Sequence, residues 1–381
     1  MKGPLSGLRL LEFEAIGPVP MCGTLLADLG AEILFVDRPR ARHVPLAVAD
    51  DTMRRGRRSI VVDLKHPRGV ETVLRLVEHA DALLEGFRPG VLERLGLGPQ
   101  VCLARNSRLI YGRMTGYGQD GPLATVAGHD IDYIALAGVL HGIGRAGERP
   151  VPPLNLIGDY GGGSLFLALG LLAALYERER SGKGQVVDAA MIDGAASLGG
   201  VFYALHAMGA WSDERGCNLL DGGAPFYDTY ETADGKYVAV GALEPQFFAE
   251  LARRIGLDEH FVARQSDRAA WPELRTRLTE IFRSRTRAQW CDLLEGSDAC
   301  VAPVLSLDEA PGHAHHRARH AFIERDGVVQ PAPAPRFSRT PGETAAPLDV
   351  SNETAEDVLS ECGFTPLEIA ELYQAGALVK K

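Results

Sequence analysis

Short apolar runs alternate with amphipathic stretches over the first 115 residues of the chain. Each apolar run has the length and composition of a buried strand. The stretches between the runs carry helical patterns, and Pro67 suits the first turn of a helix that reaches His79. The strands are expected at residues 8–13, 33–37, 59–65, 82–87 and 109–118. This alternation predicts an α/β fold in which helices cover both faces of a parallel sheet.

The pattern changes in the second half of the chain. The longest helix is expected from residue 160 to 180 and is closed by S-G-K-G. After a Gly-rich stretch, a strand pair is expected around the turn signal Asp234-Gly235, and helices follow it. We therefore expect a Rossmann-like large domain and a smaller α+β domain. The expected parts are residues 1–195 for the first part of the large domain, 196–224 for a linker, 225–307 for the small domain, and 308–381 for a returning linker and the rest of the large domain.

Composition and charge narrow the class of protein. The chain has 381 residues and a net charge of -10, which argues against general nucleic-acid binding. Its six cysteines form no C-x-x-C pair, which favours free thiols in the cytoplasm and no zinc ribbon. No signal peptide is expected, and no stretch reaches the ~18 uninterrupted apolar residues of a membrane helix.

The first strand–helix–strand unit lacks the fingerprint of a dinucleotide site. Asp37 ends the second strand, where a dinucleotide fold keeps its ribose acid. The first turn, however, reads E-A-I-G-P-V-P and lacks the G-x-G-x-x-G that cradles a pyrophosphate. The pattern therefore argues against an NAD enzyme.

Three places in the chain carry candidate acid–base residues. His129 and Asp130 stand at the start of an apolar helical run, where both could also serve only to begin the helix. Asp159 precedes three glycines and the long helix, and its simpler interpretation is a helix cap. Glu244 ends a strand and is either a loop carboxylate or a partner for Asp159. Two carboxylates that share one proton can supply a general acid near neutral pH.

Basic and histidine-rich segments are further candidates. The basic residues could grip phosphates or form a solvated loop; they are Arg38, Arg54, Arg55, Arg57, Arg58, Lys65, Arg88 and Arg94. Four histidines (His313, His315, His316, His320) have helical spacing, but no carboxylate or cysteine completes a metal site, and none is predicted.

Ten motifs follow one another from the N-terminus to about residue 340. They are G-P-V-P, V-D-R-P, V-V-D-L-K, F-R-P-G-V-L-E-R-L-G-L-G, R-M-T-G-Y-G-Q-D-G-P, A-G-H-D-I-D-Y, P-L-N-L-I-G-D-Y-G-G-G, G-K-G-Q-V-V-D-A-A-M, L-D-G-G-A-P-F-Y and V-G-A-L-E-P-Q-F. Together they resemble the family III CoA-transferase superfamily and, within it, the racemase branch. The resemblance implies an interlocked homodimer that acts on an acyl-CoA substrate, needs no metal or separate cofactor, and binds neither nucleic acid nor membrane.

The resemblance also assigns roles to residues. It implies that His129 and Asp159 are two bases on opposite faces of the α-carbon of a 2-methylacyl-CoA, that Glu244 pairs with Asp159, and that Asp130 supports His129. It places the CoA moiety at Arg38, Val62, Asp63, Leu64, Lys65, Arg88, Gly128 and Tyr133.

Four features depart from the family pattern. Val19 stands where the family's turn usually has glycine, and Glu14 adds a negative charge near the expected CoA site. Asp132 stands where the family often has asparagine, and the loop from Arg40 to Met53 carries extra arginine and aspartate. These departures put CoA affinity and substrate range in question, but none changes the acid–base set.

Two other functions stay open. A CoA-transferase would use Asp159 as a nucleophile that forms a mixed anhydride, and it would not need His129 and Glu244 as an opposed pair. A non-catalytic acyl-CoA-binding protein would have lost an acid–base residue, and this chain keeps all of them.

Overall fold

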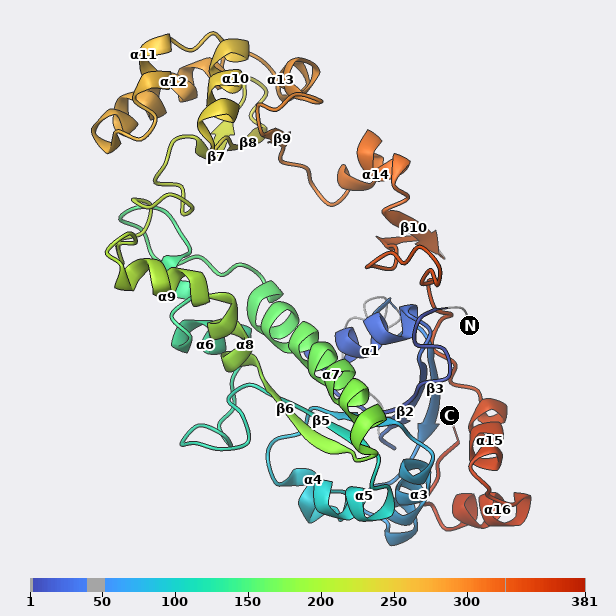
Figure 1. The fold of residues 1–381 in the computed structure, drawn as a ribbon. Coiled ribbons are helices and arrows are strands. Elements are labelled where there is room, and N and C mark those ends of the chain that lie inside the picture. Colours follow the sequence, from blue (N-terminus) through green and yellow to red (C-terminus); the bar gives the residue numbers. More distant parts are fainter. Residues whose placement is uncertain (1–2, 40–51, 326, 381) are drawn as a thin grey trace. The chain divides into compact units, whose positions relative to one another are not determined.

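The computed structural model describes residues 3–39, 52–325 and 327–380. The chain divides into two compact units, each assembled from segments far apart in the sequence (Figure 1). Unit 1 comprises Met1–Ala137, Pro153–Gly199 and Phe322–Lys381, and unit 2 comprises Gly138–Pro152 and Gly200–Ala321. The domain boundaries expected from the sequence stay a prediction.

Unit 1 is built on a parallel sheet of six strands in the order β3-β2-β1-β4-β5-β6. Leu11 of β1 lies opposite Leu34 of β2 and Leu83 of β4, so β1 is the centre from which the sheet grows in both directions. The predicted α/β fold with a parallel sheet is confirmed. The strands are β1 (Arg9–Phe13), β2 (Glu32–Asp37), β3 (Arg57–Val61), β4 (Ala82–Glu85), β5 (Ile110–Thr115) and β6 (Gln185–Ala190).

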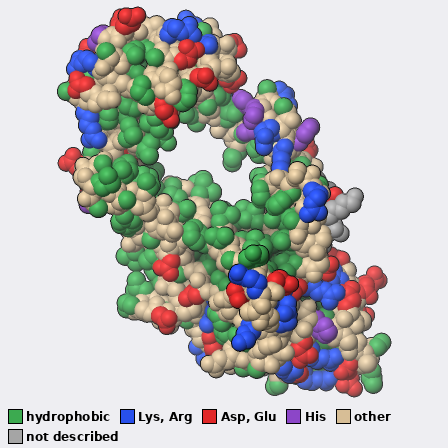
Figure 2. All heavy atoms as spheres, viewed as in Figure 1, with side chains coloured by type: hydrophobic (Ala, Val, Ile, Leu, Met, Phe, Trp, Pro, Cys, Tyr) green, Lys and Arg blue, Asp and Glu red, His purple; other side chains and the backbone are tan. Residues whose placement is uncertain are grey.

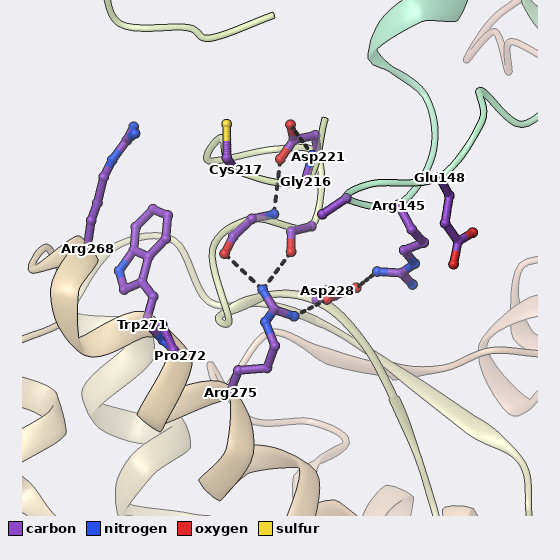
Figure 3. A pocket seen from close by; sticks show the side chains of 13 residues that line it. Arg145, Glu148, Gly216, Cys217, Asp221, Asp228, Arg268, Trp271, Pro272 and Arg275 are labelled. Atoms are coloured by element: carbon purple, nitrogen blue, oxygen red, sulfur yellow. Dashed lines mark hydrogen bonds and ion pairs between the residues drawn. The ribbon is translucent and has the colours of Figure 1, made fainter. Parts of the chain in front are cut away.

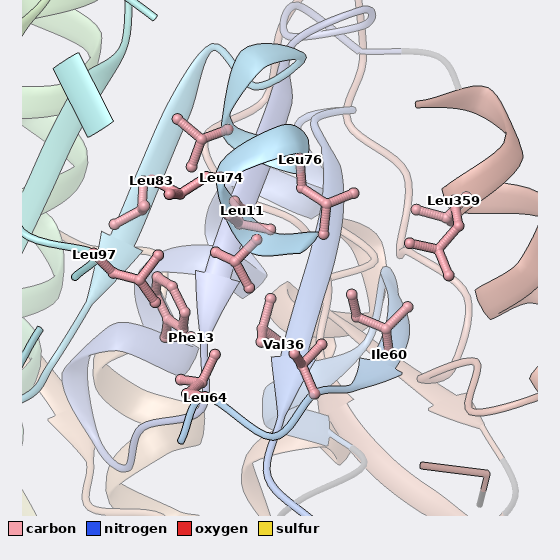
Figure 4. Close-up of a cluster of buried hydrophobic side chains, with 14 of the residues drawn as sticks. Leu11, Phe13, Val36, Ile60, Leu64, Leu74, Leu76, Leu83, Leu97 and Leu359 are labelled. Atoms are coloured by element: carbon pink, nitrogen blue, oxygen red, sulfur yellow. The ribbon is translucent and has the colours of Figure 1, made fainter. Parts of the chain in front are cut away.

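Helices cover both faces of this sheet (Figure 1). Leu11 and Phe13 point into one core, which α3, α15 and α16 close (Figure 4). Leu10 points into the other, which α1 and α7 close. The alternation follows from the period of two along a strand. The helices of unit 1 are α1 (Pro18–Asp28), α3 (Pro67–Glu78), α4 (Val91–Arg94), α5 (Pro99–Arg105), α6 (Asp130–Leu136), η2 (Leu156–Leu165), α7 (Phe166–Ser181), α8 (Met191–Leu198), α15 (Asn352–Glu361) and α16 (Pro366–Gln374), and a hairpin joins β10 (Phe322–Arg325) to β11 (Val328–Pro331).

The long helix differs from its sequence-based prediction. Its helical path begins at Leu156 rather than at residue 160, because a π-helix, η2, runs directly into α7. The combined 26 residues are long and apolar enough to cross a membrane by length and composition alone. The expectation that no stretch has ~18 uninterrupted apolar residues still holds, because Asp159 interrupts this one, and the length-and-composition test differs in that it tolerates such interruptions. Leu167 and Leu171 are fully buried against the sheet, and the core helix of a globular unit passes the same test.

Unit 2 contains an antiparallel sheet of three strands in the order β7-β8-β9. The turn between β7 and β8 carries Gly235 with φ of 70°, as the Asp-Gly signal predicts. Aromatic side chains fill the core, where Phe282 stacks on Tyr230 and meets Trp290 edge-on. The elements are β7 (Tyr227–Glu231), β8 (Tyr237–Gly241), β9 (Val301–Pro303), α9 (Gly200–Ala207), α10 (Pro245–Ile255), α11 (Glu259–Ala263), α12 (Trp271–Phe282), α13 (Arg287–Leu294), α14 (Ala314–Ala318) and the short 3₁₀ turns η1 (Leu140–Gly142), η3 (Arg268–Ala270) and η4 (Ala310–Gly312).

Candidate active site

The candidate site of unit 1 gathers at the carboxyl ends of its strands. The strand order reverses its direction of growth between β1 and β4, and open α/β sheets bind ligands outside the carboxyl ends of their strands at such a point. The turn after β1 leads through Gly17 into α1. That turn brings the chain against Asp159, which comes from a segment more than a hundred residues away.

Gly17 is the residue of this turn that faces Asp159. Its φ is +70°, and a Cβ at this position would lie 3.1 Å from Asp159 Oδ2. Val19, which departs from the family pattern, is only 1% exposed and packs in the core beside Gly86. The extra side chain of Val19 is therefore absorbed by the core, while the close approach of Gly17 to the carboxylate is kept.

Asp159 lies within the π-helix and does not cap the long helix. Asn155 occupies the cap position, and its side-chain amide donates a hydrogen bond of 3.1 Å to Asp159 Oδ2. The simpler interpretation of Asp159 as a helix cap is therefore wrong. π-Helical geometry is rare in proteins, and where it occurs it is often found at functional sites.

The pKa of the Asp159 carboxyl is raised above its ordinary value. Burial of this half-buried group is the largest cause. The hydrogen bond from Asn155 acts in the opposite direction, the negative charge of Asp130 raises the pKa further, and a positive charge on His129 lowers it. Asp159 is thus electrostatically coupled to both residues of the G-H-D turn, and a carboxyl with a raised pKa suits both proton release and proton uptake.

Helix packing explains the glycines after Asp159. A Cβ at Gly162 would lie 2.6 Å from the amide nitrogen of Ala195 in α8, and one at Gly194 would lie 2.0 Å from the carbonyl oxygen of Gly162. The two backbones therefore touch, which only glycine permits. The sequence left open whether a backbone or a ligand approaches these glycines, and for Gly162 it is the backbone of α8.

Asp130 joins the two halves of the site. It is buried at the start of α6, and its Oδ2 accepts a 2.7 Å hydrogen bond from the backbone amide of Asp159. Gly158 makes room for this contact, because a Cβ there would lie 2.6 Å from the same oxygen. The Asp130 carboxylate thus contacts Asp159. The expectation that Asp130 orients or supports His129 stays a prediction.

His129 begins α6 with an extended backbone, as the helix-start interpretation expects. Its backbone amide donates a 2.9 Å hydrogen bond to Asp132 Oδ2, which fixes the turn. The imidazole is exposed, and its charge acts on Asp159. The backbone of His129 therefore starts the helix while its side chain is available for chemistry.

Tyr133 forms a buried wall beside the acid–base residues. Its ring meets Tyr117 edge-on with centroids 4.9 Å apart, and Gly128 leaves the space that both rings need. The pKa of Tyr133 is raised to about 12, mainly by burial and then by the charges of groups that include Asp159. The positive charge of Arg88 acts in the opposite direction. Gly128, Tyr133 and Arg88, all expected to hold CoA, are therefore neighbours of the site.

The residues of the segment Val62–Lys65 differ in whether they could contact a ligand at the carboxyl edge of the sheet. Val62 and Leu64 are buried in the core, and Val62 also bridges to Leu378. Asp63 accepts a 2.9 Å hydrogen bond from the backbone amide of Lys65, whose side chain is exposed. Core packing alone accounts for Val62 and Leu64. Lys65 is the residue of this segment whose positive charge is available to a ligand.

Glu244 belongs to unit 2. It caps α10, its side chain is exposed, and its charge raises the pKa of the Cys300 thiol after the larger effect of burial. The pairing of Glu244 with Asp159 therefore joins residues of different units and stays a prediction.

The chain matches the family model described as CoA-transferase family III over residues 5–348. The chain belongs to this family. It is 47% identical over 371 residues to alpha-methylacyl-CoA racemase of Mus musculus, covering 97% of this chain and 96% of the relative. The Homo sapiens protein of the same name is 45% identical over 372 residues, with the same coverage. A CAIB/BAIF family protein from Brucella suis is similar in structure, with a TM-score of 0.82 at 27% identity, covering 95% of this chain and all of that one.

Arg55 and Arg57 of the basic cluster form buried ion pairs, contrary to both interpretations of these two residues, while phosphate binding by Arg38, Lys65 and Arg88 stays a prediction. Arg57 donates a 2.8 Å hydrogen bond to Glu12 Oε2, and both side chains are fully buried. Arg55 pairs with Asp28 in the same core. A glutamate inside the buried run L-R-L-L-E-F was the sequence signal for such a partner, because a buried charge needs one.

Unit 2 contains a hollow of about 770 Å³ that the sequence did not suggest. Asp228 lies at its wall and pairs with both Arg145 and Arg275, and the latter also donates hydrogen bonds to the backbone carbonyls of Gly222 and Gly223 (Figure 3). Three of its charged side chains, Asp228, Arg145 and Arg275, thus pair with one another, and none of the candidate catalytic residues lines it.

Histidines gather over α14 in unit 2 (Figure 2). His313 Nε2 lies 3.1 Å from Glu295 Oε1, and His316 contacts the carbonyl oxygen of Ala310. In the part of the chain that the structure describes, no three His, Cys, Asp or Glu side chains form a group that could hold a metal ion.

Proposed function

We propose that this family III member is an isomerase that inverts the α-carbon of 2-methyl-branched acyl-CoA thioesters. The observation that carries the proposal is the 2.7 Å hydrogen bond from the backbone amide of Asp159 to Asp130 Oδ2, which joins the half-buried Asp159 to the turn that carries His129. The racemase names of the relatives at 45–47% identity support the same reaction.

The proposed reaction is a proton transfer in two steps. One base removes the α-proton, and the charge spreads to the thioester oxygen as a planar enolate. The other group then delivers a proton to the opposite face. In one direction His129 is the base and Asp159 the acid, and in the other their roles exchange. Because the α-carbon has the same oxidation state before and after, the reaction consumes no redox cofactor.

Asp130 and Asn155 would act as positioning residues. Asp130 holds the backbone of Asp159, and Asn155 holds its Oδ2. A carboxylate fixed at two points loses little freedom when substrate binds, and orientation of this kind is a large part of catalytic rate.

The CoA moiety would bind along the same edge of the sheet. Arg38, Lys65 and Arg88 follow the carboxyl ends of three strands and supply positive charge. The charge of Arg88 acts on Tyr133, which lies against Gly128. Arginine and lysine at such an edge suit the phosphates of CoA.

We further propose that the active form is an interlocked homodimer in which Glu244 completes the site by pairing with Asp159. Large apolar side chains are exposed on α7 and α9 (Figure 2), among them Leu169, Tyr176 and Tyr203, and a partner subunit would cover such residues. The six cysteines are free thiols, which agrees with a cytoplasmic location.

The alternative is a CoA-transferase, and the family model and the presence of Asp159 both allow it. In that reaction the Asp159 carboxylate attacks the thioester carbonyl and expels CoA as a thiolate. The mixed anhydride that forms is attacked at the Asp159 carbonyl by the CoA thiolate, which releases the donor acid and leaves CoA on Asp159 as a thioester. An acceptor carboxylate attacks this thioester, and the expelled CoA thiolate then attacks the acceptor carbonyl of the second anhydride, which gives the new thioester and restores the Asp159 carboxylate. His129 has no necessary part in these steps, which is why we favour the racemase.

One incubation separates the two reactions. The purified protein is given one enantiomer of a 2-methylacyl-CoA in deuterated water, with and without a free carboxylate acceptor. Racemisation with deuterium at the α-carbon and no need for acceptor supports the racemase. Transfer of CoA to the acceptor without α-exchange would refute it and establish the transferase.

A further inference from the structure

Charged side chains follow the carboxyl ends of neighbouring strands of unit 1. Glu14 follows β1 directly, Arg38 follows β2, and Arg88 comes shortly after β4. The strand order places β1 between β2 and β4, at the point where the sheet reverses its growth. An anionic ligand is expected outside this edge. Glu14 therefore places a negative charge among the cations that would bind this anionic ligand.

Glu14 and Arg38 form an ion pair across these two strands. The Nε of Arg38 donates a 2.5 Å hydrogen bond to Glu14 Oε2. The backbone amide of Glu14 donates to the carbonyl oxygen of Val36, and the backbone amide of Arg38 donates to the Asp37 carboxylate. Both partners are thus anchored to the sheet.

The two partners differ in exposure. The side chain of Glu14 is 10% exposed and that of Arg38 is 59% exposed. The carboxylate is thus held inside while the guanidinium faces solvent. A phosphate that approaches Arg38 meets a cation that a fixed anion already neutralises, and the partly buried surroundings screen that anion less than water would.

We propose that Glu14 limits the affinity of this edge for phosphorylated ligands by occupying and neutralising Arg38. The inference deepens the proposed function, on which it rests for the identity of the ligand as a CoA thioester. It makes position 14 a determinant of CoA affinity in this family III chain. It also assigns a physical consequence to a residue that departs from the family pattern.

Calorimetric titration with CoA tests the proposal. The proteins are the wild type, Glu14→Gln, Arg38→Met and the double variant. Glu361→Gln is the control, because Glu361 forms an exposed ion pair with Arg58 outside the site. We expect Glu14→Gln to lower the Kd for CoA by roughly threefold to tenfold, and to leave it unchanged in the Arg38→Met background. The same substitution should not change binding of pantetheine, which lacks the phosphates.

Several outcomes would overturn the inference. Weaker CoA binding in Glu14→Gln would mean that Glu14 positions Arg38 for the phosphate. An unchanged Kd, or equal tightening of pantetheine, would mean that the pair has no effect on phosphate. Glu14→Ala must repeat the result, which guards against an effect of the new amide. If the wild type bound no CoA, the proposed function would fail with it, whereas CoA binding without tightening in Glu14→Gln removes this inference alone.

Discussion

The carboxylate of Asp130 accepts a hydrogen bond from the backbone amide of Asp159, with 2.7 Å between Oδ2 and the amide nitrogen. The contact links the start of α6 to the π-helix, and so links the residue after His129 to the second candidate base. Because the carboxylate binds backbone, it sets where Asp159 lies without sharing the proton of its side chain. The geometry of the acid–base pair therefore depends on a residue that need not touch the substrate.

Loss of this contact should slow catalysis more than it weakens binding. Asp130→Ala removes the acceptor, and we expect kcat to fall by about tenfold to a hundredfold with a smaller change in KM, because a displaced base costs rate. Steady-state racemisation kinetics measure both values. Asp130→Asn keeps an acceptor oxygen and should retain more activity. Equal activity of Asp130→Ala and the wild type would contradict the positioning role.

Asn155 should shift the pH dependence of the reaction. Its hydrogen bond lowers the pKa of Asp159, so Asn155→Ala should raise that pKa further above its ordinary value. In the direction in which Asp159 is the base, activity requires the deprotonated form, and the acidic limb of the kcat profile should move to higher pH. Asp130→Asn removes a negative charge that raises the pKa of Asp159, so the acidic limb of the kcat profile of this variant should move to lower pH. Shifts in the same direction for both variants would refute this account.

Close packing of η2 on α8 should make Gly162 intolerant of a side chain. Gly162→Ala places a Cβ against the backbone of Ala195, and we expect the free energy of unfolding to fall by about 1–3 kcal/mol, as in overpacked cores. Denaturation in urea measures the change. Gly200→Ala is the matched control, because it adds the same methyl to a helix in open space. Equal stability of the two variants would contradict the packing role.

The buried pair of Arg57 and Glu12 should contribute far more to folding than the neighbouring exposed pair. Arg57→Met leaves Glu12 buried without its cation and should cost about 3–5 kcal/mol of unfolding free energy. Arg58→Met breaks an exposed pair with Glu361 and should cost at most about 1 kcal/mol. Urea unfolding of both variants decides the point. Similar losses would mean that burial of the first pair has no energetic consequence.

The centre of the sheet was predictable because β1 and β4 are short apolar runs of the kind that a parallel sheet covered on both faces buries. Leu11 and Leu83, opposite each other in the register, came from two such runs. The position of Asp159 was not predictable, because a π-helix has no side-chain periodicity that separates it from the α-helix that follows. Its partner Asn155 was missed for the same reason, since it stands before the residue from which the helix was expected.

The basic run shows the other limit of sequence reasoning. The sequence predicts Arg55 and Arg57 to be phosphate ligands or solvated cations, because charge alone says nothing about where its partner lies. Their partners, Asp28 and Glu12, are more than twenty-five residues earlier and meet them only when β3 joins β2 in the sheet. The buried pair also requires glycine at position 23, since a Cβ there would lie 2.0 Å from Glu12 Oε2.

The most direct test of the two-base account is α-proton exchange in the single-base variants. His129→Ala and Asp159→Asn are each incubated in deuterated water with each enantiomer of a 2-methylacyl-CoA, and exchange and chirality are followed by NMR and chiral chromatography. The account predicts that neither variant racemises, that each exchanges the α-proton of one enantiomer with retention, and that the two variants select opposite enantiomers. Racemisation by either variant at the wild-type rate, or exchange of both enantiomers by one of them, would contradict the account.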